Sequence, residues 1–566
     1  MIKKEKILLL LIIILAAILR FTGLNWDQNQ HLHPDERFLT MVADAIKIPQ
    51  SFSDYLDPQL SSMSPYNKGF DFFVYGTLPL NLTKILAVNF GFDGYSKIYL
   101  LGRLLSSLFD LSTLLLTYII CKNLFSKKSA LFAALAYSLM VLPIQLSHFF
   151  TVDTFLNFFM VLTFYFLVKA ADKPRLLYFL GLSFSYGLAL SSKVSALYFL
   201  PIIGIFFLFI LFKGKWSGST LFLMMIALLS TAISFRLAQP TAFAQSSFLN
   251  WQPNEQFLGN LKTLKSMGNI DSWFPPDVYW ISRQSKLFAL EHVTMWALGI
   301  PLGLLSLISL PFSTYRIIRT TNLHPFKNSK TFSILSIIIW VVFLFVYQSF
   351  QFTKNLRYFL IIMPFLSVLV GYLLASSVKH FQKFIPSKLY LGIIIILVSI
   401  WPLSFISVYL RPHSRILASY WIYENISKGS QLTCEHWDDC LPLNISSSQN
   451  PSVYEITQLN LYDPESEEKW QNINSVLANS DYMVITSNRL YGSIPFVSNR
   501  YPLTTEFYEK LFGNQLNFTK VAEFHPKPCF LGIESPLTCI NDEWAEESFT
   551  VYDHPKVHIF KKISLQ

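Results

Sequence analysis

Long apolar runs dominate residues 7–410, and they constrain the fold more than any other feature of the sequence. Each run is close to the roughly 20 residues that an α-helix needs to cross the hydrocarbon core of a bilayer. Only 14% of the chain is charged, whereas a soluble domain carries about 25%. The sequence therefore predicts a polytopic α-helical membrane protein.

The runs number about eleven, so we expect about 11 transmembrane helices. The predicted spans are 7–24, 97–121, 129–148, 154–170, 175–191, 195–212, 219–237, 290–312, 331–350, 357–377 and 388–410. The first run could instead belong to a signal peptide. Its flank, residues 20–23, lacks the usual small-residue cleavage site, so we expect the run to be retained.

The composition changes at residue 411, where polar and charged residues become evenly spread. We expect two domains, a transmembrane domain at 1–410 and a tail at 411–566 that is long enough for one small globular domain. The transmembrane domain contains two long external loops, at 25–96 and 238–289.

Basic residues gather in alternate loops, which predicts the orientation of the chain, because cytoplasmic loops are enriched in Lys and Arg. The alternate basic loops carry Lys3, Lys4 and Lys6; Lys122, Lys127 and Lys128; Lys169, Lys173 and Arg175; Lys213 and Lys215; Arg316, Arg319, Lys327 and Lys330; and Lys379, Lys383 and Lys388. The N-terminus is therefore expected in the cytoplasm and the tail outside, as in a multi-pass plasma-membrane protein. This topology explains the net charge of +10 better than a nucleic-acid partner would.

The tail contains four of the five cysteines, Cys434, Cys440, Cys529 and Cys539. An even number in an exported domain is typical of disulfides. Four cysteines allow three pairings, and we favour the local one that joins each close pair, with free thiols as the alternative.

The tail is expected to be a small α/β domain. Ser414 is placed to cap a helix that Gly429 stops, and residues 466–479 have a second helical pattern. Strands are predicted at 431–434, 482–486, 519–524 and 557–561.

The segment His31-Leu-His-Pro-Asp-Glu-Arg-Phe38 opens the first external loop. Pro34 suits the first position of a helix, which places Asp35 and Glu36 in the first turn. The simplest interpretation is that two acids stabilise an amphipathic helix on the membrane surface.

A second group of ionisable residues lies at the external ends of the spans, where charge is costly and invites a functional interpretation. Asp153 opens the fourth span, although it could merely cap its helix. The cations of this group are Arg103, Lys193, Lys354 and Arg357. Snorkelling to lipid headgroups accounts for any one of them, but less well for four cations beside acids.

This order of residues resembles that of the dolichyl-phosphate-mannose protein mannosyltransferases and their bacterial relatives, including the aminoarabinose transferases. The resemblance covers roughly residues 1–410 and rests on the Asp-Glu pair, Arg103, Asp153, Ser192-Lys193 and Arg357-Tyr358. It implies a C-type glycosyltransferase fold. The segment with Trp437-Asp438-Asp439 is similar to the tails of bacterial members, but the tail as a whole departs from both branches, so the acceptor cannot be inherited.

The resemblance also implies roles for single residues. Asp35 would be the catalytic base and Glu36 would help hold the acceptor, with Arg37 and His33 as accessory neighbours and Asp153 as an accessory acid. Arg103 would bind the donor phosphate, together with Arg357 and Lys193. A weaker hypothesis gives Trp437, Asp438 and Asp439 contact with the acceptor, against the alternative of a buried aromatic and capping acids.

These residue types suit the transfer of a mannose-like sugar from a polyprenyl-phosphate carrier to a protein hydroxyl, lipid or glycan. A base removes the acceptor proton, fixed cations hold the departing phosphate, and one direct displacement inverts the anomeric centre. No cofactor is expected. A divalent metal held by His31, His33, Asp35 and Glu36 is the alternative, although Pro34 limits how far these side chains converge.

Two other classes of function compete with a transferase. A transporter of lipid-linked sugars or solutes typically has helices broken near the midplane and inverted repeats, and neither is evident in the sequence. A non-catalytic scaffold that displays the tail is the third possibility, and the Asp-Glu pair argues against it.

Overall fold

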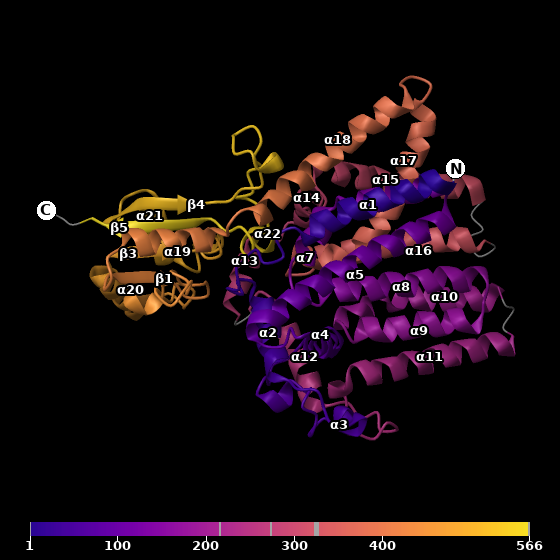
Figure 1. Cartoon of the computed structure of the whole chain (residues 1–566), viewed down its shortest axis with the longest axis horizontal. Helices are drawn as coiled ribbons and strands as arrows, with labels where there is room; N and C mark the ends of the chain where they lie inside the picture. The colour runs from indigo at the N-terminus through magenta and orange to yellow at the C-terminus, as the bar shows by residue number, and fades with distance from the viewer. Residues whose placement is uncertain (1, 214–216, 272–273, 322–327, 564–566) are drawn as a thin grey trace.

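The computed structural model describes residues 2–213, 217–271, 274–321 and 328–563. A bundle of helices occupies one end of the elongated molecule and a small sheet domain occupies the other (Figure 1). The N-terminus lies at the end of the bundle that is far from the sheet domain.

The helices of the bundle overlap all the predicted spans, but the span predicted at 290–312 is displaced, because Gly299, whose backbone is left-handed, separates α15 from the π-helical turn η5 (Val293–Ala297). Eight helical segments within the described residues are long and apolar enough to cross a membrane, and a bent pair makes a ninth. The eight are α5 (Tyr95–Leu124), α8 (Asp153–Asp172), η2 with α10 (Val194–Lys213), α11 (Gly218–Ala238), α15 (Ile300–Thr321), α16 (Ser329–Ser349), η7 with α17 (Leu356–Phe381) and the segment that begins with α18 (Ser387–Phe405). The bent pair is α6 (Lys127–Ser138) with α7 (Val141–Ser147), and the two remaining predicted spans correspond to α1 (Ile2–Phe21) and α9 (Leu176–Leu190). The membrane-protein fold class is confirmed.

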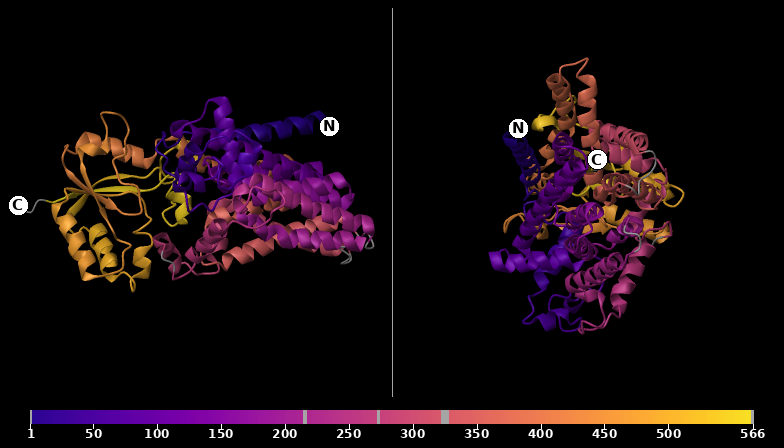
Figure 2. Two further views of the ribbon diagram at one scale, coloured as in Figure 1. Left: turned by 90° about the horizontal axis from the view of Figure 1, so that it is seen from below. Right: turned by 90° about the vertical axis from the view of Figure 1, so that its right-hand side faces the viewer.

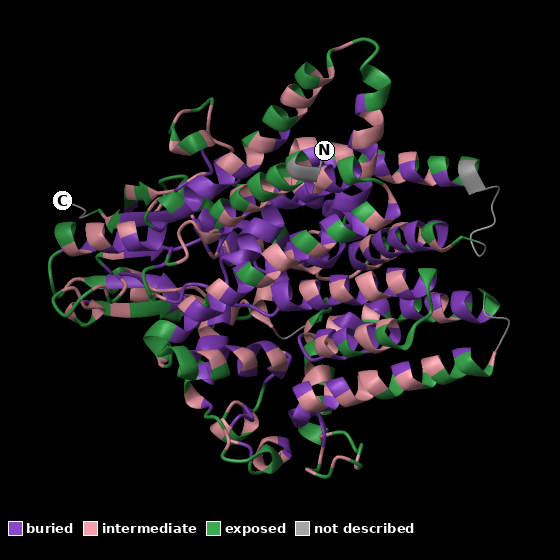
Figure 3. Ribbon diagram, turned by 45° about the vertical axis from the view of Figure 1, so that its right-hand side comes forward, coloured by how far each residue is buried: buried purple, intermediate pink, exposed green. Residues whose placement is uncertain are grey.

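The outer faces of the bundle are apolar although they are exposed. On α11 only 22% of the most apolar stretch is buried, and Leu228 on this helix is 65% exposed. Ile396 on α18 is 66% exposed. Figure 3 shows buried residues on the facing sides of the helices and exposed residues along the outer helices. Such apolar outer faces are what a lipid environment requires.

The bend between α6 and α7 is stabilised by a buried charge. The two helices meet at 58°, and the break leaves carbonyl groups without partners inside the helix. Arg20 at the end of α1 donates to the carbonyl oxygens of Ser138 and Tyr137, and its guanidinium pairs with Asp110 of α5. An intramembrane cation is thus neutralised where the backbone needs a donor.

The loop at 25–96, which the sequence predicts to be external, carries α2 (Pro34–Ala45), α3 (Phe52–Leu56) and α4 (Thr77–Phe90). Just before α4, the Gly76 amide donates to the Ser192 carbonyl (3.1 Å), and the Leu78 amide donates to the Ser191 carbonyl (3.1 Å). A Cβ at Gly76 would lie 2.0 Å from the Ser191 oxygen, so only glycine fits this contact. The loop is therefore held against the link between α9 and η2, next to Lys193.

The tail folds around a five-stranded mixed sheet with the order β2-β1-β3-β5-β4. β1 is parallel to β2 and β3, whereas β5 is antiparallel to β3 and β4. The strands are β1 (Gln431–Glu435), β2 (Glu455–Leu459), β3 (Tyr482–Ile485), β4 (Phe518–Phe524) and β5 (Val557–Lys562), and the principal helices are α19 (Ser414–Asn425), α20 (Glu467–Asn479) and α21 (Pro502–Phe512). Four of the strands and two of the helices match the sequence prediction, whereas β2 and α21 were missed.

Helices cover both faces of this sheet (Figure 2). Val484 and Ile559 pack with residues of α19, whereas their neighbours Met483 and Phe560 pack with residues of α20 and α21. This alternation follows from the two-residue period of a β-strand. The cap of α19 differs from the prediction, because the His413 ring accepts from the Arg415 amide and Ser414 is the first helical residue.

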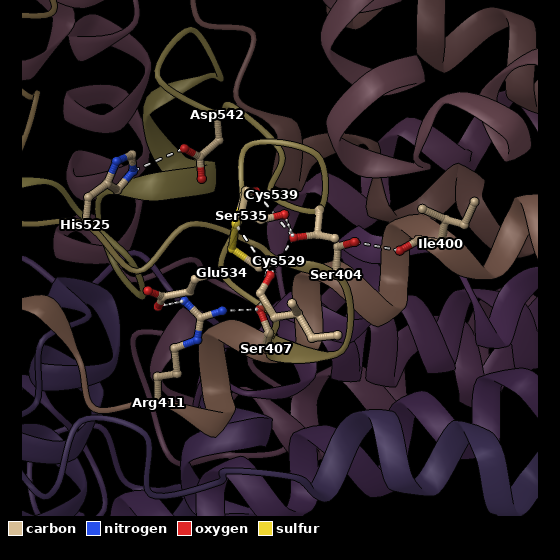
Figure 4. Close-up of a disulfide and its surroundings, with 12 residues drawn as sticks. Ile400, Ser404, Ser407, Arg411, His525, Cys529, Glu534, Ser535, Cys539 and Asp542 are labelled. Atoms are coloured by element: carbon tan, nitrogen blue, oxygen red, sulfur yellow. Dashed lines mark hydrogen bonds and ion pairs between the residues drawn. A yellow bond between two sulfur atoms is a disulfide. The ribbon is translucent and has the colours of Figure 1, made fainter.

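Two disulfides are present in the tail, Cys434–Cys440 and Cys529–Cys539. The loop closed by the second packs against the end of the last membrane helix, where the Cys529 amide donates to Ser407 Oγ (3.0 Å). Arg411 pairs with Glu534 of the same loop at 2.7 Å (Figure 4). The disulfide loop thereby ties the tail to the bundle.

A buried charge network also joins the two domains. His554 lies between Asp542 and Asp553, and it is fully buried. Asp553 accepts from the Tyr409 hydroxyl (2.6 Å) and from Gln145 Nε2 on α7 (3.0 Å). Burial alone would lower the pKa of His554, but the two carboxylates outweigh it and raise this pKa to about 10.

Because the pKa of His554 is raised in the folded protein, its contribution to stability is complete below the unfolded pKa of about 6.5. The contribution is lost as the pH rises toward 10. We expect the thermal midpoint of the purified protein to fall between pH 7 and 10, and the fall to be smaller in His554→Gln. Scanning fluorimetry across this range measures both. His380→Gln, at an exposed site on α17, is the matched control. Parallel losses in wild type and His554→Gln would contradict this role.

Candidate active site

Asp35 lies in the first turn of α2, where the local sequence positions it as predicted. Pro34 occupies the first helical position, and the His33 ring caps the helix by accepting from the Glu36 amide (3.3 Å). The His33 ring is buried between the rings of Phe149 and Tyr552. Burial lowers the pKa of His33 to about 4, so the imidazole is neutral near pH 7 and acts as a cap.

Asp35 pairs with Arg357, which opens the tenth predicted span. Both side chains are 22% exposed, so the pair lies at the rim of the protein interior. Burial would raise the pKa of Asp35, but Arg357 outweighs this effect, and His33 and the nearby Tyr75 hydroxyl act in the same direction as Arg357. The pKa of Asp35 is therefore well below its usual range, and the carboxylate is ionised.

A cavity of about 470 Å³ lies beside this ion pair. Three cations line it, Lys193, Lys265 and Arg357, together with the carboxylate of Asp153. The remainder of the wall is aliphatic and aromatic, and it includes Leu156, Leu197, Tyr198, Leu344, Tyr347, Tyr358 and Ile361. Its volume is within the range of small-molecule sites in proteins.

The cations of the cavity retain unused hydrogen-bonding capacity. Arg357 donates to Asp35 through Nη1, while its buried Nε has no hydrogen-bond partner. Lys193 Nζ lies 2.7 Å from Asp153 and 5.4 Å from the centre of the Tyr358 ring. Lys265 comes from α12 (Glu255–Met267) in the second external loop, a segment that the sequence analysis did not single out. Positive charge on three separate elements therefore converges on one space.

Arg103 does not join this group, contrary to the phosphate-binding role expected from the sequence. Its guanidinium is fully buried and donates to Asp27, to Glu36 and to the Leu24 carbonyl. The rings of Trp26 and Tyr99 cover it at 4.8 Å each. Every nitrogen of this guanidinium is hydrogen-bonded, so the geometry disagrees with direct contact to a sugar donor.

Lys354 also lies away from the cavity, because its ammonium group donates to the Arg283 carbonyl and to Gln284, each at 3.3 Å.

Glu36 belongs to the same buried cluster, which disagrees with its expected contact to the acceptor. Its carboxylate accepts from Arg103 and also from the Phe150 amide (2.6 Å), just before α8. Burial raises the pKa of Glu36, and repulsion from the neighbouring Asp27 carboxylate acts in the same direction, against the attraction of Arg103. The sequence analysis missed Asp27, although a carboxylate that directly follows a span is a signal of the same kind as Asp35.

The acidic segment of the tail forms structural ion pairs, which neither sequence interpretation described, because Trp437 is exposed and both acids pair with arginines. Asp438 is almost completely buried and pairs with Arg415, and Asp439 bridges Arg415 (2.6 Å) and Arg37 (2.7 Å). Arg37 thus joins α2 to the tail. Trp437 has a left-handed backbone and sets its ring edge against Phe274. Both carboxylates are engaged in these ion pairs, which disagrees with the weaker hypothesis that this segment contacts the acceptor.

The predicted metal ligands do not converge. The His31 ring stacks between Tyr95 and Tyr99, His33 caps α2, and the carboxylates of Asp35 and Glu36 face different arginines. Among the residues that the structure describes, no three His, Cys, Asp or Glu side chains form a group suited to a metal ion. The donor set therefore does not fit the metal alternative.

Comparison with known proteins is consistent with the predicted family. Residues 97–236 match the family model described as dolichyl-phosphate-mannose-protein mannosyltransferase. The chain carries this family's segment from α5 to α11. That segment contains Asp153 and Lys193 but neither Arg357, which lines the same cavity, nor Asp35, which pairs with Arg357. No curated protein sequence matches the chain.

Solved structures share the architecture. The oligosaccharyltransferase AglB from Archaeoglobus fulgidus, in complex with an inhibitory peptide and a dolichol-phosphate, aligns with a TM-score of 0.52 at 10% identity over 99% of this chain and 88% of that one. The A. fulgidus oligosaccharyltransferase with Zn and sulfate aligns with a TM-score of 0.53 at 13% identity over 88% and 71%. ArnT from Cupriavidus metallidurans, bound to undecaprenyl phosphate, reaches 0.43 at 12% identity over 85% and 93%. The family resemblance is confirmed by the family model, and the fold by the two A. fulgidus structures.

The Arg103 cluster generates a prediction that separates stability from donor binding. Arg103→Ala leaves the buried carboxylates of Asp27 and Glu36 without a counter-charge, which should cost about 3–5 kcal/mol. Arg103→Lys keeps the charge but loses the forked contacts, so it should also lower the thermal midpoint. Folded Arg103→Lys should bind polyprenyl-phosphate sugar as tightly as wild type. Thermal unfolding and a donor-binding titration, with Arg357→Lys as comparison, provide the measurements. A stable Arg103→Lys with weakened donor binding would restore the phosphate role.

Proposed function

We propose that the chain is an integral-membrane, inverting glycosyltransferase that moves a sugar from a polyprenyl-phosphate carrier to an extracytoplasmic acceptor. The observation that carries this proposal is the position of Asp35. Its carboxylate is paired with Arg357, and Arg357 lines a cavity together with Lys193 and Lys265. A base beside an anion-binding space is the minimum that this reaction needs.

The cavity suits a lipid-linked sugar phosphate. Lys193, Lys265 and Arg357 supply positive charge for a phosphate, and the adjoining aliphatic side chains suit a prenyl chain. The AglB structure of similar fold was determined with a dolichol-phosphate, which supports a donor of this class. Aromatic faces such as Tyr358 are of the kind on which a sugar ring packs.

The chemistry proceeds by one displacement. Asp35 takes the proton of the acceptor hydroxyl while that oxygen forms a bond to the anomeric carbon. The bond from this carbon to the phosphate oxygen breaks, and polyprenyl phosphate leaves with the electron pair. Attack from the face opposite the leaving group inverts the configuration, and the cations hold the charge that develops on the phosphate.

The ion pair with Arg357 gives Asp35 a basicity that depends on the donor. With the guanidinium on Asp35, the carboxylate is a weak base because its pKa is low. As the leaving phosphate gains negative charge, it competes for the same guanidinium, whose Nε is still free for it. Loss of that contact raises the proton affinity of Asp35 at the moment when the acceptor proton must move.

The membrane orientation remains part of this proposal. We place the N-terminus in the cytoplasm and the tail outside, because the basic loops of the sequence and the tail belong to opposite ends of the bundle. The transferred sugar is expected to be mannose-like, and the acceptor to be a protein hydroxyl, a lipid or a glycan.

Transport is the competing function, and the bend between α6 and α7 is the feature that would favour it, because transporters bind substrates at broken helices. The carbonyls at this break are already bonded to Arg20, which is fully buried. They are not available to a substrate, so this feature supports a structural role.

The test of the proposal is Asp35→Asn, which keeps the shape of the side chain and removes its basicity. We expect the transfer rate to fall about 10²- to 10⁴-fold, because general-base catalysis contributes that much. Donor affinity should be unchanged or higher, since Arg357 is released. The measurement is polyprenyl phosphate released from a panel of polyprenyl-phosphate sugars by protein in nanodiscs.

Asp44→Asn makes the same chemical change at an exposed position of the same helix and should be neutral. An active Asp35→Asn beside a dead Asp153→Asn would show that the base is the other carboxylate. Full activity of both would end the transferase proposal.

Arg357→Gln should change the dependence of kcat/KM on pH. In the wild type the lowered pKa keeps Asp35 unprotonated, so kcat/KM should fall only when the pH drops below the ordinary range of carboxyl groups. Without Arg357, burial is no longer opposed, and the acid limb should move to higher pH. The donor KM should also rise roughly 10- to 100-fold, the value of a charge-assisted hydrogen bond.

Lys193→Gln is the matched control, because it should raise the donor KM without moving the acid limb. Profiles of kcat/KM against pH for the three proteins decide the matter. An acid limb that stays in place in Arg357→Gln would refute the coupling between Arg357 and Asp35.

A further inference from the structure

A second cavity lies entirely within the tail, and the proposed transfer reaction does not use it. Its volume is about 480 Å³, which suits a small ligand, and all of its lining residues fall between 488 and 558. It opens between the segment after β3, the end of α21, the loop that follows β4, and β5. None of its residues lines the cavity beside Asp35.

One wall of this tail cavity is aromatic. The rings of Tyr491 and Phe512 are 5.1 Å apart, and the Phe512 ring is 5.4 Å from that of His558. Phe512 is 39% exposed although it belongs to the domain outside the bundle, where no lipid covers it. An exposed group of rings beside a cavity is a surface on which a flat apolar face can stack.

The charged side chains at the cavity are already neutralised. Lys520 pairs with Glu523 at 2.6 Å. Lys556 pairs with Glu543 at 2.7 Å and with Glu523 at 3.2 Å. Because Glu523 and Glu543 offset the two lysines, the cavity wall has no excess of positive charge, unlike the cavity lined by Lys193, Lys265 and Arg357. The tail cavity therefore suits an uncharged ligand.

The wall of the cavity also holds polar groups without a partner. The buried carboxylate of Asp542 is not one of them, because the rings of His525 and His554 pair with it at 3.2 Å and 3.1 Å. Figure 4 shows His525 directed at Asp542 through one ring nitrogen, and the other, Nδ1, has no partner. The Thr550 hydroxyl also has none. Both groups suit a ligand with hydroxyl groups, which donate and accept hydrogen bonds.

We propose that the tail cavity binds a neutral carbohydrate. A sugar ring has an apolar face for Tyr491 and Phe512 and hydroxyl groups for His525 Nδ1 and the Thr550 hydroxyl. The combination of aromatic faces, paired charges and unpartnered polar groups is met by a polyhydroxylated ring.

The position of the cavity connects this carbohydrate to the proposed active site. Thr550 closes the short helix α22 (Glu547–Thr550) and lines the cavity. On the same helix, Ser548 donates to Asn355 (3.1 Å), two residues before Arg357. The short helix α22 therefore lies between a glycan bound in the tail cavity and the segment that carries Arg357. From this position we assign the acceptor to the glycan class. That assignment rests on the proposed function, whereas binding of the carbohydrate does not.

The experiment measures binding of short, soluble, neutral oligosaccharides to the full-length protein in detergent, by saturation-transfer NMR and by titration. We expect saturable binding that weakens at least 10-fold in Tyr491→Ala and in Phe512→Ala. Tyr491→Phe keeps the ring and should retain binding. Tyr420→Ala, on the helix that covers the other face of the sheet, is the matched control and should bind like wild type.

Asn488→Ala provides a second variant at a partly exposed lining position, where misfolding is not expected. It should weaken binding, because it removes an amide from the cavity wall. Absence of saturable binding by wild type, equal binding by wild type and the two ring-deleted variants, or displacement of the sugar by an unrelated peptide would overturn the proposal. Asp35→Asn should bind the oligosaccharide normally. Its transfer activity tests the proposed function separately.

Discussion

The buried guanidinium of Arg103 is the interaction on which the arrangement of the external face depends. It ties together the end of the first span, the start of α2 and, through Glu36, the backbone just before α8. Because these contacts are fully desolvated, breaking any one leaves a charge buried without a partner. The position of Asp35 follows from this arrangement. Because Arg103 holds the neighbouring Glu36 side chain, the first turn of α2 has a single orientation.

Arg103 and Arg357 therefore have different surroundings, although the sequence analysis had assigned binding of the donor phosphate to both. Arg103 has every donor satisfied and acts as a clamp, whereas Arg357 keeps a free nitrogen and lies on a cavity with Lys193 and Lys265. The difference between them is burial and partner number, since both are cations at the external ends of apolar helices. The tail takes part as well, because Asp439 reaches Arg37 on α2 and the loop around Asp553 reaches the bundle.

The spans, the α2 helix and most of the tail sheet were predictable because each depends on a local pattern. Pro34 and two acids define the start of α2 independently of its surroundings. Apolar runs of membrane length predict membrane-spanning helices, because few other structures accommodate them. β2 and α21 were missed because their sequences lack a clear period or cap. The partners of Arg103, Glu36 and Asp438 could not be predicted, because a charged side chain carries no local signal of which partner it will meet.

The sequence by itself determined the membrane class, the two-domain division and the candidate carboxylate, since hydropathy and helix-start chemistry act over a few residues. Only the tertiary structure decided which cations share a space with that carboxylate. Lys193, Lys265 and Arg357 are separated by 72 to 164 positions in the chain, yet they line one cavity. Their meeting depends on the packing of helices and loops far apart in sequence, such as the contact of Gly76 with the Ser191–Ser192 link. No local pattern encodes such a contact, because its energy exists only once the whole bundle has formed.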